Sequence, residues 1–388
     1  MIKTAAAPQQ TLHFTYFLVL VSLQGFTSSM LGMFLPLYFK QIGMAGVQTG
    51  IYFAVSTLGP LLLTMPMGIT TDRRSIAAIL MISFALQALQ PIGFILSTSF
   101  ALFCITAFVS SFGKRFYSTA MNTMFFKLAG NKNPRYAGLF QLWRFSAMGM
   151  GMLVGGMLIE EFSFAMLFAV SLGINTLFIL LSLFAPRTET TIVKIKEYKK
   201  SVLTPRVLFI SFLFLLSCMH WGAEHVAYTP FLKEVLGLNF RQTGIYTALC
   251  FFFVGFGAYS AVILLEWNWI KDLRQLLVVG WLLSGVFHIL MCIPNVYWSF
   301  SFRAIHEIGD GFVFLAFYHG VSKIFKHEQI GGCAAFISTL MMTGMIVGSI
   351  LFGYVGDRFG YAVPLIASGG ILILVPILMN ISRDEVLR

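Results

Sequence analysis

The sequence predicts an all-α membrane protein with twelve transmembrane helices in two pseudo-symmetric six-helix bundles. Three observations support this fold class: an apolar composition, apolar runs of membrane-spanning length, and an internal repeat. Of the 388 residues, 58% are hydrophobic and 11% are charged, and the mean hydropathy is +0.84. Because soluble domains carry roughly 25% charged residues, this composition excludes a soluble globular protein.

Apolar runs recur along the whole chain, and each is long enough to cross a hydrocarbon core of about 30 Å, which takes about 20 residues. The first run is about twice as long as the apolar core of a secretory signal. We therefore expect it to be retained as a helix. The twelve predicted spans are 13–39, 47–70, 76–97, 99–126, 137–160, 163–185, 207–232, 240–265, 273–294, 297–324, 332–356 and 361–381.

The pattern Pro-(x6)-Gly-(x4)-Gln-Thr-Gly-Ile-Tyr over residues 36–52 returns over residues 230–246, at an offset of 194. Repeated halves in a membrane protein indicate two bundles that flank a central substrate path. The one long polar segment, RTETTIVKIKEYKKSVLTP, lies at the repeat boundary. We therefore predict an N-terminal bundle over 1–186, a solvated linker over 187–205 and a C-terminal bundle over 206–388. Part of the linker is expected to form an amphipathic helix on the lipid surface, and the alternative is that the linker is a docking site for a partner.

The net charge of +11 would suggest nucleic acid as a partner in a soluble protein, but its distribution indicates topology instead. If both termini lie on one side, that side receives eighteen Lys and Arg residues and the other side receives four. The positive-inside tendency then places both termini and the linker in the cytoplasm. We expect a multi-pass protein of the inner (plasma) membrane that does not bind nucleic acid.

The five cysteines all lie inside apolar spans without paired spacing, so they predict neither disulfides nor metal ligands. No motif for a cofactor or for a nucleotide-binding loop is present, which disfavours an ATP-driven pump. We expect no cofactor, no metal and no enzymatic activity.

The tenth span carries four ionisable residues on one face. At 100° per residue, Arg303, His306, Glu307 and Asp310 fall within an arc of about 100°. Arg303 and Glu307 are four residues apart and could simply neutralise each other. Alternatively, the face is a proton relay, because a poorly hydrated carboxylate gains affinity for protons and a nearby cation lowers that affinity again.

In the seventh span, His220 and Glu224 are stacked four residues apart. Ionisable residues inside a span cost at least ~2.5 kcal/mol at the bilayer centre and tend to face a cavity or a partner. Glu224 is thus a second candidate proton carrier, and the alternative is a buried acid that bridges to His220.

The first half contains cations but no acid within its spans. These cations either pair with Glu224, Glu307 or Asp310 across a cavity, or they hold an anionic substrate, to which arginine is well suited. The candidate substrate-binding residues are Arg115, Ser118, Asn122 and the flanking Lys114 in the fourth span, with Trp143 and Arg144 in the fifth.

The sequence Gly68-x-x-x-Asp72-Arg73-Arg74 follows the second span. Together with twelve spans in two similar halves, it resembles the first half of the loop signature of the major facilitator superfamily. This resemblance implies alternating access between two bundles and a cytoplasmic gating loop with Gly68, Asp72 and Arg73. The order of Arg303, His306 and Asp310 also resembles the tenth helix of lactose permease-type proton symporters, although the acid here follows the histidine by four residues instead of three.

These features predict a monomeric secondary transporter, surrounded by membrane lipids, that moves a small polar or anionic solute by proton symport. In this interpretation the residues of the first half bind the solute, and Arg303, His306, Glu307, Asp310, Glu224 and His220 couple protons. Two alternatives remain. One is proton-driven efflux of drugs or other amphipathic compounds, and the other is a non-transporting membrane receptor or scaffold on the same fold.

Overall fold

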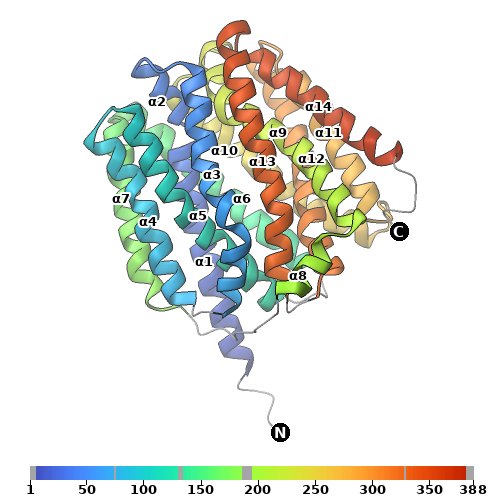
Figure 1. Ribbon diagram of the computed structural model, residues 1–388. Coiled ribbons are helices and arrows are strands. Elements are labelled where there is room, and N and C mark those ends of the chain that lie inside the picture. Colours follow the sequence, from blue (N-terminus) through green and yellow to red (C-terminus); the bar gives the residue numbers. More distant parts are fainter. Residues whose placement is uncertain (1–5, 74–75, 130–133, 186–194, 327–328, 382–388) are drawn as a thin grey trace.

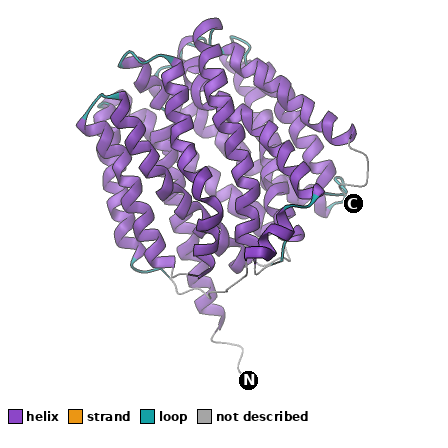
Figure 2. Ribbon diagram, viewed as in Figure 1, coloured by secondary structure: helices purple, strands orange, loops and turns teal. Residues whose placement is uncertain are grey.

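The computed structural model describes residues 6–73, 76–129, 134–185, 195–326 and 329–381, and this part of the chain contains helices and no strand. Of its fourteen helices, twelve have at least 18 residues, and the other two, α2 and α8, have seven and eight (Figures 1 and 2). The predicted fold class is therefore confirmed. Eleven of the twelve long helices coincide with predicted spans to within a few residues. The first long helix, α1, starts earlier than predicted, and the end of its predicted span lies in α2.

The helices of the first half follow one another with short connections. They are α1 (Ala6–Gly32), α2 (Leu35–Gln41), α3 (Gly46–Arg73), α4 (Ile76–Leu96), α5 (Phe100–Ala129), α6 (Pro134–Glu161) and α7 (Phe164–Ser182). The first predicted span is split between α1 and α2, because the chain turns at residues 33 and 34 just before Pro36, which is suited to the first turn of a new helix.

The second half has the same order of long helices. It comprises α8 (Ile195–Val202), α9 (Pro205–Glu234), α10 (Phe240–Glu266), α11 (Leu273–Leu290), α12 (Val296–Ile324), α13 (Ile330–Phe359) and α14 (Ala362–Ile381). The repeat is visible in the structure, because α3 and α10 begin 194 residues apart, at Gly46 and Phe240. It is not exact, since α9 continues as one helix through Pro230 where the first half is broken.

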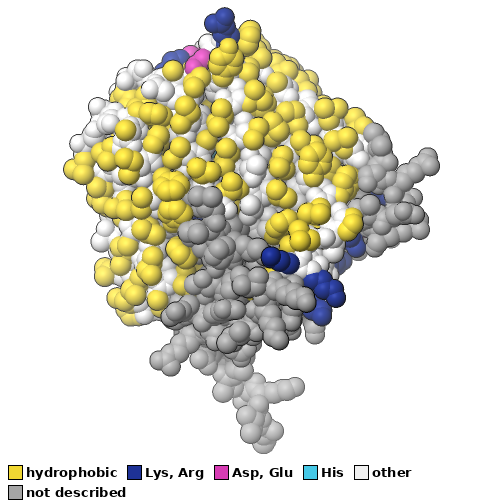
Figure 3. All heavy atoms as spheres, viewed as in Figure 1, with side chains coloured by type: hydrophobic (Ala, Val, Ile, Leu, Met, Phe, Trp, Pro, Cys, Tyr) yellow, Lys and Arg dark blue, Asp and Glu magenta, His cyan; other side chains and the backbone are white. Residues whose placement is uncertain are grey.

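Within the described residues, nine helices are long and apolar enough to cross a membrane. Hydrophobic side chains cover the middle of the face shown in Figure 3, and the Lys and Arg residues visible there lie near its two ends. This distribution fits a multi-pass membrane protein. Helix α12 is not among the nine, and it carries Arg303, Glu307 and Asp310 within its length.

The two halves meet along α6 and α10 and along α3 and α13, and glycines allow these helices to approach closely. A Cβ atom placed on Gly156 of α6 would lie 2.4 Å from the carbonyl oxygen of Phe240, and one on Gly149 would lie 2.6 Å from that of Ala248. Side chains larger than hydrogen at these positions would force the two halves apart.

At one end of the bundle, which we call the far face (residues 40–47, 160–163, 234–241 and 357–361), acidic side chains of one half cap helices of the other. Asp357, at the end of α13, accepts hydrogen bonds from the backbone N–H groups of Gly46 (2.9 Å) and Val47 (3.1 Å) at the start of α3. Glu160, at the end of α6, accepts one from the backbone N–H of Phe240 at the start of α10 (3.1 Å). Two ion pairs, Arg241 with Glu161 and Lys40 with Glu234, add to this closure.

The opposite end, the linker face (residues 134–136, 195–206 and 266–273), is also bridged. Arg135 of α6 makes a two-pronged ion pair with Glu266 of α10, at 2.7 and 2.8 Å. Helix α8 lies against the start of α13, with the Tyr198 ring buried next to Gly332. In the described part of the linker, the predicted lipid-surface helix is therefore wrong, because the apolar side of α8 contacts protein.

Candidate functional site

The face of α12 that the sequence singled out is buried inside the second half. Arg303, His306, Glu307 and Asp310 are each no more than 4% exposed. With His220 and Glu224 of α9 and His288 of α11, they form a group that we call the acid–histidine cluster. Charged side chains in such a position require partners, because an isolated buried charge is very costly.

Arg303 is paired with two carboxylates. Its guanidinium contacts Glu307 Oε1 at 2.5 Å on the same helix and also forms an ion pair with Glu224 Oε1 on α9. The guanidinium carbon lies 4.2 Å from the centre of the Tyr228 ring, a cation–π geometry. The predicted pairing of Arg303 with Glu307 is thus present, and Glu224 shares the same cation.

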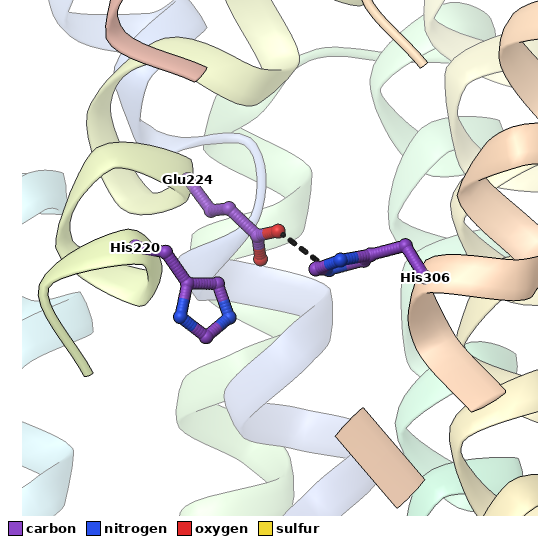
Figure 4. A group of neighbouring side chains, drawn as sticks. All are labelled: His220, Glu224 and His306. Atoms are coloured by element: carbon purple, nitrogen blue, oxygen red, sulfur yellow. Dashed lines mark ion pairs between the residues drawn. The ribbon is translucent and has the colours of Figure 1, made fainter. Parts of the chain in front are cut away.

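His306 joins α12 to α9 and α11. Its Nδ1 lies 2.9 Å from the backbone carbonyl oxygen of Ser284, and its Nε2 lies 3.2 Å from Glu224 Oε1, as the dashed line in Figure 4 marks. Among the described contacts, Glu224 and His220 do not form the predicted bridge. Instead, His220 faces Asp310.

Asp310 is surrounded by donors. Ser284 Oγ donates to its Oδ1 at 2.7 Å, Trp221 Nε1 donates to its Oδ2 at 2.8 Å, and His220 Nε2 lies 3.3 Å from the same Oδ2. A carboxylate that accepts two or three hydrogen bonds is stabilised in its charged form.

Sequence reasoning missed the contribution of α11. His288 is fully buried, with Nδ1 at 3.4 Å from Glu224 Oε1 and Nε2 at 3.1 Å from Ser368 Oγ of α14. Ser284, one turn earlier, contacts both His306 and Asp310. The available signal was a single histidine in an otherwise apolar span, which does not reveal its partners.

The hydrogen bonds of two histidines fix where protons must lie. In both His220 and His306, Nδ1 faces a backbone carbonyl oxygen, of Ser217 and Ser284 respectively, so Nδ1 must carry a hydrogen. The Nε2 atom of His220 then faces Asp310 Oδ2, whereas that of His306 lies 3.2 Å from Glu224 Oε1 outside hydrogen-bond geometry. Two facing lone pairs repel, so the His220–Asp310 pair requires one further proton, on the ring or on the acid.

The charges of the cluster favour a second added proton. The cluster holds three carboxylates (Glu224, Glu307 and Asp310) and one permanent cation, Arg303, so it has a charge of −2 when its histidines are neutral. Two added protons make it neutral. The arrangement is therefore suited to take up and release protons.

A metal ion fits this arrangement less well. One nitrogen of His220, one of His306 and one oxygen of Glu224 lie within 4.8 Å of one another, which is close enough to suggest three ligands. His306, Glu307 and Asp310 form a second group with such spacing. Each group includes a carboxylate that is already paired with Arg303, Glu224 in the first and Glu307 in the second, so a divalent cation would lie beside a buried guanidinium and be repelled by it.

Three of the predicted solute-binding residues converge on a tyrosine of the other half. Tyr318 of α12 donates a hydrogen bond to Asn122 Oδ1 (3.1 Å) and accepts one from Arg144 (3.4 Å). Arg115 is close enough to Tyr318 for an electrostatic interaction, and its guanidinium donates to the carbonyl oxygen of Ala335 of α13 (3.4 Å). We call these four residues, Arg115, Asn122, Arg144 and Tyr318, the Tyr318 group.

Lys114 lies elsewhere, although it is adjacent to Arg115 in sequence. It lines a small cavity inside the first half, between α1, α4, α5 and α7. Among the described residues, no carboxylate lies within 4.0 Å of a side-chain nitrogen of Lys114, Arg115 or Arg144. The acids are committed to Arg303 and to the histidines.

The remaining predicted residues are not brought to either group. Trp143 is 55% exposed, on the same outward apolar side of α6 as Leu139 and Met150, and Ser118 is half-buried on α5. The residues predicted for the gating loop, Gly68, Asp72 and Arg73, lie in the last turns of helix α3. Their side chains, and Arg74, lie outside what the structure describes.

Comparison with known proteins agrees with this architecture. A sequence model of the Major Facilitator Superfamily matches residues 17–271. The chain is 25% identical, over 158 residues, to the multi-drug resistance efflux pump PmrA of Streptococcus pneumoniae, and the match covers 39% of either protein.

Solved structures with a similar fold cover nearly the whole chain. The nucleoside transporter NupG has a TM-score of 0.75 at 14% identity, covering 95% of this chain and 99% of that one. A POT family transporter in complex with a peptide conjugate has a TM-score of 0.75 at 12% identity, covering 96% of both. The human organic anion transporter MFSD10 has a TM-score of 0.65 at 14% identity, covering 94% of this chain and 99% of that one. Since the family match spans most of the sequence and the fold agrees, the chain belongs to the Major Facilitator Superfamily of transporters.

Proposed function

We propose that this protein transports a small anionic organic solute across the cytoplasmic membrane by alternating access, coupled to the symport of protons. The observation that carries the proposal is the separation of charge between the two halves. The three acids of the acid–histidine cluster pair with Arg303 and three histidines and can hold two added protons, while Lys114, Arg115 and Arg144 of the first half have no acidic partner among the described residues.

Coupling between proton and solute follows from electrostatics. Tyr318 lies eight residues after Asp310 on α12, a rise of about 12 Å. At that separation, two unit charges interact by about 1.4 kcal/mol when the effective dielectric constant is about 20. Loading two protons removes a charge of −2, which favours an anion at the Tyr318 group by roughly 3 kcal/mol, on the order of a hundredfold in affinity.

The order of events is therefore protons before solute. The neutral cluster permits the anion to bind between the halves, and the bundles then change their exposure to the two sides of the membrane. Release of the protons restores the negative charge and expels the anion. Movement of the loaded carrier is favoured because its buried charges are compensated.

Proteoliposomes with an imposed pH gradient test the proposal, after a thermal-shift screen of the purified protein against organic acids has identified a ligand. Glu224→Gln and Asp310→Asn should abolish accumulation driven by the gradient, while exchange of labelled for unlabelled solute survives. Glu160→Gln, which removes an acid of the far face, is the matched control and should retain accumulation. Full accumulation in both cluster variants would refute proton coupling by this cluster.

A second candidate function is proton-driven efflux of amphipathic compounds, favoured by the partial similarity to PmrA. The same proteoliposomes separate the two. For symport, solute accumulates on the side to which protons flow, whereas for antiport it accumulates on the side from which they come.

A further inference from the structure

Trp221 of α9 connects the acid–histidine cluster to the boundary between the two halves. Its indole Nε1 donates a hydrogen bond to Asp310 Oδ2 (2.8 Å), and its ring is stacked on the Phe314 ring of α12, with centroids 5.0 Å apart and planes inclined by 10°. Asp310 and Phe314 are about one helical turn apart, so Trp221 lies along the side of α12 that carries both. The indole is thereby held at two points, its N–H group and its face.

The contacts continue into the first half. The Phe145 ring of α6, which is 3% exposed, lies 4.9 Å from the Phe314 ring. The guanidinium carbon of Arg144 lies 5.4 Å from the centre of the Phe145 ring, and Arg144 also donates to the Tyr318 hydroxyl. We call Trp221, Phe314 and Phe145 the aromatic bridge, because they join Asp310 to Arg144 through successive side-chain contacts.

Trp221 differs from the other hydrogen-bond partners of Asp310. The further hydrogen bonds of Ser284 and His220 run to His306 and to the Ser217 carbonyl oxygen, both in the second half. Trp221 instead contacts a ring that touches α6. Among the described contacts, it is the donor that links this carboxylate to the first half.

The hydrogen bond of Trp221 responds to proton loading. An indole N–H can only donate, and it donates about twice as strongly to an ionised carboxylate as to a neutral acceptor. In the unloaded His220–Asp310 pair, the bare Nε2 lone pair cannot bind the carboxylate, so Trp221 is the donor that stabilises Oδ2. A proton between the two residues gives Oδ2 a second partner or neutralises it, and the indole is then held less tightly.

We propose that Trp221 is a positioning residue that transmits proton loading of the His220–Asp310 pair to Arg144 through the aromatic bridge. In the unloaded pair, the tight hydrogen bond holds the bridge in place and fixes Arg144. Proton loading loosens the bridge and frees the guanidinium to turn to an anion. The inference rests on the proposed proton coupling, and it adds a route by contact to the interaction of charges through space.

Other titratable groups surround the His220–Asp310 pair. They come from α9, from α11 and from α12 itself: Cys218, Glu224, His225, His288, His306 and Glu307. Substitutions in the aromatic bridge change none of these side chains. An effect of such a substitution on the response to pH is therefore an effect of the bridge.

Tryptophan fluorescence of the purified, ligand-free chain tests whether Trp221 senses the proton. The difference between the wild type and Trp221→Phe isolates the emission of Trp221, which should change with pH in one transition as the pair takes up its proton. The transition should vanish in Asp310→Asn. Trp281→Phe is the matched control and should leave the transition unchanged, because Trp281 is also a buried tryptophan of the second half, but its Nε1 has no hydrogen-bond partner among the described residues.

Arg144→Gln then separates contact from charge. Loss of the cation should raise the pH midpoint of the Trp221 transition, and charge acting through space predicts the same shift with and without Phe314. Transmission through the bridge predicts a shift that is larger by about half a pH unit or more in the wild type than in Phe314→Leu, which keeps the indole N–H but breaks the stack. Phe145→Leu, which breaks the contact on the side of the first half, should reduce the shift in the same way.

The inference is overturned if the emission of Trp221 does not depend on pH, or if Arg144→Gln shifts the midpoint equally in the wild-type, Phe314→Leu and Phe145→Leu backgrounds. Equal shifts would leave the proposed coupling by charge intact, since that coupling needs no aromatic contact. Because the titration uses neither a solute nor a pH gradient, loss of proton-driven accumulation with an intact, Phe314-dependent shift would count against the proposed symport alone.

Discussion

Replacing Arg303 by Met tests whether the acid–histidine cluster is held together by one cation. The guanidinium is 1% exposed and contacts both Glu224 and Glu307. Met has a similar length but no charge, so the substitution leaves two buried carboxylates without their cation. Breaking a buried pair in this way costs about 3–5 kcal/mol.

The deficit should depend on pH. In the variant, the folded state can avoid a buried unpaired charge by holding an additional proton on Glu224 or Glu307. The unfolded chain releases that proton above about pH 5, since an ordinary glutamate has a pKa near 4.3. The folded variant then binds more protons than the unfolded chain, and its stability relative to the wild type should fall as pH rises, by about 1.4 kcal/mol per unit and per proton.

Unfolding can be followed in detergent with a dye that becomes fluorescent on reaction with thiols, because four of the five free cysteines are buried. Arg135→Gln is the control, since its pair with Glu266 is exposed and is worth no more than about 1 kcal/mol. Glu307→Gln added to Arg303→Met should recover part of the loss. If Arg303→Met unfolds like Arg135→Gln at every pH, the cluster does not depend on this cation and the charge count is wrong.

Three further predictions concern other regions. Tyr318→Phe removes the hydroxyl at the centre of the Tyr318 group and should weaken the binding of an anionic ligand about 2- to 12-fold in a titration; unchanged affinity would place the solute elsewhere. A cysteine in place of Lys199 on α8 should react with a membrane-impermeant maleimide only after lysis, because the distribution of basic residues predicts a cytoplasmic linker; labelling of intact cells would reverse the predicted topology. Asp357→Ala removes the cap of α3, which stabilises the helix by about 0.5–2 kcal/mol. The substitution should accelerate labelling of a cysteine introduced at the buried position Thr49. An unchanged labelling rate would show that the cap does not hold the far face closed.

The helices could be predicted well because the membrane simplifies the problem. Backbone groups in hydrocarbon must be bonded within a helix, so an apolar run of sufficient length almost determines its secondary structure. The charged face of α12 followed from helix geometry alone, since residues three and four apart must share a side. The break between α1 and α2 was missed, because Pro36 is tolerated at the start of a helix as well as near a turn.

Contacts between helices could not be predicted in the same way. Lys114 and Arg115 are neighbours in sequence, but the rotation of 100° per residue places Lys114 at the small cavity between α1, α4, α5 and α7 and turns Arg115 towards α13. The choice of Asp310 over Glu224 as the partner of His220, and the participation of His288, depend on how α9, α11 and α12 are rotated against each other. Trp143 was assigned to the solute path because it adjoins Arg144, yet adjacency in a helix separates two side chains.

The ion pair between Lys40 and Glu234 joins two positions that are 194 residues apart, so each is the repeat counterpart of the other. A contact between equivalent positions lies on the axis that relates the two halves. If the halves were identical copies, this point would bring two lysines or two glutamates together, and like charges would repel at the far face. Opposite charges there are available only to two unlike halves. Closure of this end therefore favours contact between a first half and a second half over contact between two copies of the same half. Fusion of the two unlike halves into one chain thus contributes to closure of the far face as well as connecting the halves.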